Sequence, residues 1–119
     1  MENTILVHDT SRFFYRHFKR EYSTYSFEYF SGEEDHQKEY FEQFKLMIFI
    51  MGSPIEMIDF FKIYNKNIPI IFCCPFEKHF FLRKQEMELI GENIKLVDVS
   101  GTKIELKKQL KPYFETCND

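Results

Sequence analysis

The stretch KLMIFIMGSP, residues 45–54, decides the fold class of this chain. Its apolar residues are continuous rather than alternating, as in a parallel strand that is covered on both faces. Ser53, Pro54 and Glu56 then follow the pattern of a helix start, with a serine cap, a proline at the first position and a glutamate at the third. The stretch therefore predicts a buried strand that runs into a helix. It contains no acidic residue.

The same alternation continues on both sides of this stretch. Apolar or alternating runs predict strands at 4–9, 26–30, 45–51, 68–74 and 94–99. Helical patterns lie between and after them, over 10–22, from Ser31, from Ser53, over 76–90 and from Thr102. Strict alternation predicts an α/β domain with helices on both faces of a parallel sheet. Five strands in 119 residues match a single flavodoxin-like, doubly wound (βα)5 domain with strand order 2-1-3-4-5.

Large apolar residues recur at helical spacing within four of the predicted helices, and we expect each set to face the sheet. The sets are Phe14, Phe18 and Tyr22; Tyr40, Phe41 and Phe44; Ile55, Ile58, Phe61 and Tyr64; and Leu106, Leu110 and Phe114. The histidines of the predicted helices, His17, His36 and His79, are expected to be exposed.

The bulk composition excludes several functional classes. The net charge of −3 argues against nucleic-acid binding, since contact with the phosphate backbone needs a basic surface. The longest apolar runs are far shorter than the roughly 20 residues of a membrane-spanning helix. The N-terminus has no signal-peptide pattern, and three cysteines fit no disulfide framework. We therefore expect a cytoplasmic protein without a membrane segment.

Three stretches are similar to motifs of one known family. ILVHDTSRFFYRHF, KLMIFIMGSP and IPIIFCCP resemble the patterns ILVVDDSR, DLVLLDxxMP and IPVIxLTA of the receiver domain of bacterial two-component response regulators. Pro54 and Pro69 fall at the proline positions of that family without a gap. The resemblance covers nearly the whole chain and implies the same flavodoxin-like fold.

The resemblance also identifies the positions where a working receiver carries its chemistry. Two acids after strand 1 and one after strand 3 hold Mg²⁺, and the strand 3 aspartate accepts the phosphoryl group. A hydroxyl after strand 4 and a lysine after strand 5 stabilise the phosphoryl oxygens. In this chain the five positions are occupied by Asp9, Thr10, Ile50, Cys74 and Ser100. Only Asp9 keeps the family's residue type. The resemblance thus implies a pseudo-receiver that is not an enzyme, binds no metal or cofactor and acts through protein contacts.

A small-ligand or redox function is the alternative. His8, Asp9, Cys74 and Ser100 are expected at the same edge of the sheet, and the Ser100-Gly101-Thr102 loop precedes a helix that could bind an anion. Simpler structural roles compete with this hypothesis. His8 lies within a predicted strand and is expected to be packed or paired at the surface. Asp9 can cap the first helix, and cysteines are often small core residues.

The fourth predicted helix favours a protein partner. In the stretch PFEKHFFLRKQEMELI, residues 75–90, four large apolar residues spread over too wide an arc for one buried stripe, namely Phe76, Phe80, Phe81 and Leu82. An exposed ring beside charged residues is typical of a contact surface. The resemblance implies the same surface, because receiver domains commonly form dimers through it. Together these points predict a protein partner or homodimer contact through the fourth helix, strand 5 and the last helix.

Overall fold

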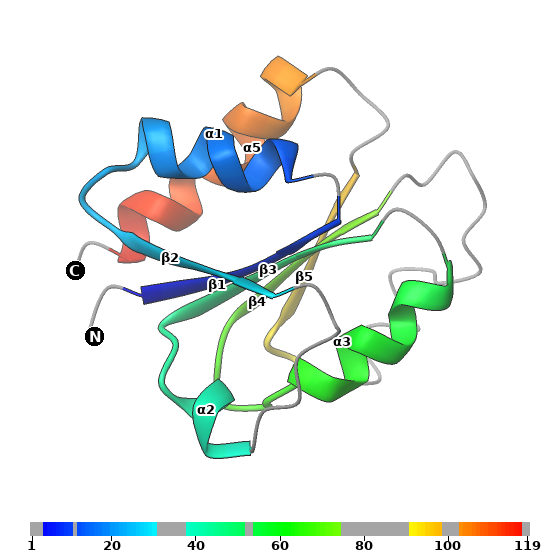
Figure 1. Cartoon of the computed structure of the whole chain (residues 1–119). Helices are drawn as coiled ribbons and strands as arrows, with labels where there is room; N and C mark the ends of the chain where they lie inside the picture. Colours follow the sequence, from blue (N-terminus) through cyan, green and yellow to red (C-terminus); the bar gives the residue numbers. More distant parts are fainter. Residues whose placement is uncertain are drawn as a thin grey trace.

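A computed structural model describes residues 4–10, 12–30, 38–51, 54–74, 91–98 and 103–117. Its centre is a five-stranded sheet in which every neighbouring pair is parallel (Figure 1). The strands are β1 (Thr4–Asp9), β2 (Ser26–Phe30), β3 (Leu46–Ile50), β4 (Ile70–Cys74) and β5 (Ile94–Asp98). Their order is β2-β1-β3-β4-β5, which confirms the predicted α/β class and strand order.

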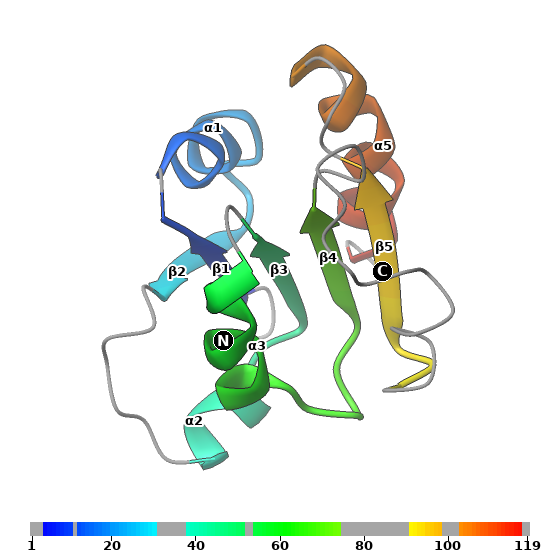
Figure 2. The ribbon, with the colours of Figure 1, turned by 90° about the vertical axis from the view of Figure 1, so that its right-hand side faces the viewer.

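Helices cover both faces of the sheet. Their bounds are α1 (Phe13–Glu21), α2 (Lys38–Glu42), α3 (Met57–Ile63), which follows the 3-10 turn η1 (Pro54–Glu56), and α5 (Lys103–Cys117). Helices α1 and α5 lie on one face, and α2 and α3 lie on the other (Figure 2). The predicted helix over 76–90 lies outside the described residues, as do the predicted helix starts at Ser31, Ser53 and Thr102.

The core has two layers because side chains of the central strands point alternately to the two faces. Every residue of β1 and β3 is buried, which explains the continuous apolar run of β3. The layer towards α2 and α3 includes Leu6, Met47, Phe49, Phe60 and Phe72. The layer towards α1 and α5 includes Ile5, Val7, Phe18, Ile50 and Phe114.

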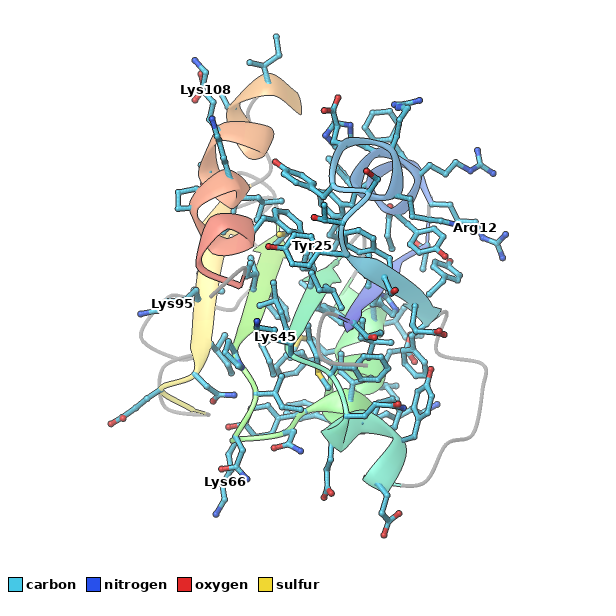
Figure 3. The ribbon with its side chains drawn as sticks, turned by 90° about the vertical axis from the view of Figure 1, so that its left-hand side faces the viewer. Arg12, Tyr25, Lys45, Lys66, Lys95 and Lys108 are labelled. Carbon is cyan, nitrogen blue, oxygen red and sulfur yellow. The ribbon has the colours of Figure 1, made fainter. Side chains whose placement is uncertain are left out.

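Aromatic side chains join α1 and α5 within the layer that these helices cover. Phe114 of α5 stacks on Tyr22 with 4.1 Å between ring centroids and lies 5.4 Å from Phe18 of α1. The hydroxyl of Tyr25 donates a hydrogen bond to the carbonyl oxygen of Phe114, and Figure 3 shows Tyr25 directed into the molecule towards α5. Phe18 and Phe114 are buried as the helical spacing predicted.

Asn93 joins two loops at the amino edge of the sheet, the edge where the parallel strands begin. Its side-chain nitrogen donates hydrogen bonds to the carbonyl oxygens of Asn65 at 2.8 Å and Ile68 at 2.6 Å. Its side-chain oxygen lies 3.3 Å from the Tyr64 hydroxyl, which donates to it. The α3–β4 connection is therefore fastened to the turn that precedes β5.

The orientation predicted for the third helix is wrong for three of its four residues. Ile55, Ile58 and Phe61 are 73%, 61% and 59% exposed, whereas Phe60 and Ile63 are buried. The segment carries two apolar stripes, and the one that packs also contains Tyr64, which contacts the core as predicted. The packed stripe also brings Glu56 inward, where its Oε1 atom lies 4.0 Å from Nδ1 of His8 in β1.

The prediction for His17 is also wrong, since this side chain of α1 is buried beside Phe18. His36 and His79 lie outside the described residues. None of the helices in the described part of the chain is both long and apolar enough to cross a membrane.

Candidate functional site

Strand register fixes the candidate site at the carboxyl edge of the sheet, where the strands end. Asp9 of β1 pairs with Ile50 of β3, and Ile50 pairs with Cys73 of β4. One position further along, Cys74 pairs with Asp98 of β5. The row Asp9–Ile50–Cys73 therefore crosses three neighbouring strands at the edge where the sequence placed the site.

The side chains at two of the predicted site positions, Cys74 and Ser100, lie outside the described part of the structure. The backbone of Cys74 belongs to β4, but its side chain is outside the described part of the structure. Ser100 and the Ser100-Gly101-Thr102 loop are also outside it. Thr10, which follows β1, is exposed.

Asp9 is buried, and its carboxylate caps α1. The backbone N–H groups of Phe14 and Tyr15 donate to Asp9 Oδ2 at 2.7 and 3.3 Å. Arg12, between strand and helix, has the left-handed φ of 63°, and its N–H donates to the Asp9 carbonyl oxygen at 3.0 Å. This tight turn folds the start of the helix back onto the aspartate. The structural role predicted for Asp9 is confirmed, since unpaired N–H groups at a helix start need such an acceptor.

Ile50 is a core residue. Its side chain is buried in the layer towards α1 and α5, together with Val7 and Cys73. The position that the resemblance assigns to the phosphoacceptor thus holds an apolar group without nucleophilic atoms. The buried Cys73 likewise offers no accessible thiol at this row, because its side chain is fully enclosed.

A second polar group lies on the opposite face of β1. His8 is completely buried, and its Nε2 atom is 3.3 Å from Oδ2 of Asp59 in α3. Its Nδ1 atom is 4.0 Å from Oε1 of Glu56 in η1. The imidazole stacks on Phe49, with ring centroids 4.2 Å apart and an interplanar angle of 15°. We call His8, Glu56 and Asp59 the His8 cluster.

Of the two structural roles expected for His8, packed in the core or paired at the surface, the structure shows the packed one. Sequence reasoning missed both of its carboxylate neighbours. In the sequence, Glu56 fits the pattern of a helix start, and the predicted stripe Ile55–Ile58–Phe61 gives Asp59 no role. A histidine in a strand buried on both faces was the available signal, because a buried polar group needs a partner. The spacing of Glu56, Phe60 and Ile63 was the second signal, since it marks the alternative inward stripe.

The described residues contain no group of three or more histidine, cysteine or acidic side chains arranged to hold a metal ion. Comparison with protein-family models, with curated proteins and with solved structures found no match.

Proposed function

We propose that this chain is a receiver-like signalling module with a flavodoxin-like fold, which cannot accept a phosphoryl group and acts by protein contact. The proposal rests mainly on one observation. In a sheet of order β2-β1-β3-β4-β5, the end of β3 carries the buried Ile50 where the three motifs of the sequence place the phosphoacceptor. Isoleucine has no atom that can attack a phosphoryl donor.

The neighbouring groups support the same proposal. Asp9 is the one family acid that remains, and its Oδ2 atom already accepts two backbone hydrogen bonds from α1. Thr10 supplies no second carboxylate for Mg²⁺, an ion that favours carboxylate and water oxygens. The module is therefore proposed to be non-enzymatic and, as a component of two-component-type signal transduction, cytoplasmic.

Contact with a protein partner is supported by apolar side chains at the surface. Ile55, Ile58 and Phe61 form an outward row on η1 and α3, and Ile104 of α5 is 64% exposed. The predicted contact through the fourth helix, β5 and α5 stays a prediction, because Phe76, Phe80 and Phe81 lie outside the described residues.

Incubation with acetyl phosphate and Mg²⁺, followed by intact-mass spectrometry, tests the proposed loss of chemistry. We expect no phosphorylated species, while a receiver that retains its phosphoacceptor and is treated in parallel becomes phosphorylated. Stoichiometric phosphate on an aspartate of this chain would refute the proposal.

The alternative small-ligand or redox function gains no support from Cys73, since its thiol is enclosed by the core. Titration with a thiol reagent, combined with phosphate and flavin binding assays, separates the two functions. The receiver-like proposal predicts slow cysteine modification in the folded protein and no bound ligand. Rapid modification or stoichiometric flavin would instead favour the redox function.

A further inference from the structure

We propose that the His8 cluster is a proton-dependent clasp, in which protonated His8 holds α3 against the carboxyl end of the sheet. This inference does not depend on the proposed signalling role. It follows from the positions of three buried or partly buried ionisable side chains that the receiver-like proposal leaves unused.

The geometry presents a carboxylate oxygen to each nitrogen of the imidazole. Asp59 Oδ2 lies 3.3 Å from Nε2, and Glu56 Oε1 lies 4.0 Å from Nδ1. Among the described residues, Nδ1 has no hydrogen-bond partner. The ring cannot turn towards solvent, because it is fully buried and stacked on Phe49.

The charge state of His8 decides whether both contacts are attractive. Only the imidazolium form has a proton on each nitrogen, so only this form can interact favourably with both carboxylates. A neutral imidazole directs a lone pair at one of them, and two acceptors facing each other in a buried site repel. Loss of the proton therefore weakens one of the two contacts between β1 and the η1–α3 segment.

The elements packed around His8 contribute few further charges in the described part of the structure. Behind Asp59, Lys62 of α3 places its Nζ atom 4.0 Å from Oδ1, close to the surface. Strands β2 and β3 contribute the rings of Phe30 and Phe49. Among the described residues, the two carboxylates of the cluster are the charged groups that lie within 4.0 Å of the imidazole nitrogens.

The pH dependence of the clasp has a definite sign. The contacts are strongest where His8 is protonated and both acids are ionised, and they weaken as His8 loses its proton at higher pH. Histidines exchange this proton between about pH 5 and about pH 8. Both carboxylates belong to the segment that carries Ile55, Ile58 and Phe61, so opening of the clasp displaces this apolar row.

Hydrogen exchange of backbone amides, followed by NMR between about pH 5.5 and about pH 7.5 and corrected for intrinsic rates, tests the clasp. We expect the opening constant of α3 to rise with pH, by up to about tenfold per pH unit for release of one proton. Amides of α5, on the other face of the sheet, serve as the internal reference. His8→Gln should make the α3 opening constant independent of pH, whereas the control His17→Gln, at another buried histidine, should preserve the dependence.

Two readouts keep the test decisive if His8→Gln fails to fold. Asp59→Asn, at a partly exposed site, should reduce the pH dependence of α3 opening. In the wild type, ¹⁵N shifts of the His8 ring should report loss of the imidazolium form over the same pH range in which α3 opening rises. A neutral tautomer across the whole range, or α3 opening that does not vary with pH, would overturn the clasp.

Discussion

At the scale of single residues, two neighbouring side chains of β1 fasten helices on opposite faces of the sheet. Successive strand residues point to opposite faces of the sheet. Asp9 therefore contacts α1, while His8 contacts α3. Both side chains are buried and polar, and both have partners on the next packed element. The end of β1 thus positions the two helical layers.

Replacing Asp9 tests its role as a helix cap. Asp9→Ala should lower the free energy of unfolding by about 1–2 kcal/mol, because the N–H groups of Phe14 and Tyr15 lose their acceptor. Asp9→Asn keeps a side-chain oxygen at this position and should cost less. Urea denaturation of the three proteins measures both effects, and equal losses for the two variants would contradict the capping role.

Introducing an acid at Ile50 tests whether the missing chemistry can be restored by one substitution. Ile50→Asp should not enable phosphorylation, and burial of its carboxyl should cost roughly 1–3 kcal/mol beyond the loss of packing. Ile50→Val, the control for packing alone, should cost about 0.5–1.5 kcal/mol. An Ile50→Asp protein with unchanged melting temperature that takes up phosphate from acetyl phosphate would contradict this expectation.

At the scale of elements, α3 presents two adjacent phenylalanines to different surroundings. Phe60 is fully buried, whereas Phe61 is 59% exposed. Phe60→Ala should lower the free energy of unfolding by about 3–5 kcal/mol. Phe61→Ala should change it by no more than about 0.5 kcal/mol. Thermal and urea denaturation compare the pair directly, and similar losses for both would mean that the helix is turned differently.

The same helix marks how far the fold could be predicted from the sequence. Apolar or alternating runs identified the strands, and their alternation with helical patterns predicted the order 2-1-3-4-5. The face of α3 was not predictable in the same way, because the stripe through Ile58 and the stripe through Phe60 fit helical spacing equally well. The stripe that packs brings Asp59 next to His8, fifty-one residues away in the chain, a contact that local spacing does not show. The capping role of Asp9 was predictable because its partners follow it directly.

At the scale of the whole molecule, Asn93 joins segments that are far apart in the sequence. Asn93→Ala removes two hydrogen bonds to the loop between α3 and β4. We expect a loss of about 1–3 kcal/mol in the free energy of unfolding, since two carbonyl oxygens lose their donor. Asn67→Ala is the matched control. Asn67 lies in the same loop and is exposed, and the hydrogen bond that it donates to Asn65 Oδ1 comes from its backbone N–H, which alanine keeps. A control variant as unstable as Asn93→Ala would contradict this role.

The strand order also has a consequence for synthesis on the ribosome. Once β3 has emerged, β1 has both of its neighbours, and β4 and β5 can then join the growing side of the sheet in the order in which they are translated. Until β4 arrives, however, the nascent chain presents β3, whose five residues are all apolar, as an unpaired edge. Such an edge pairs readily with other chains. A polypeptide released by premature termination between β3 and β4 should therefore be a substrate for chaperones or a source of aggregates.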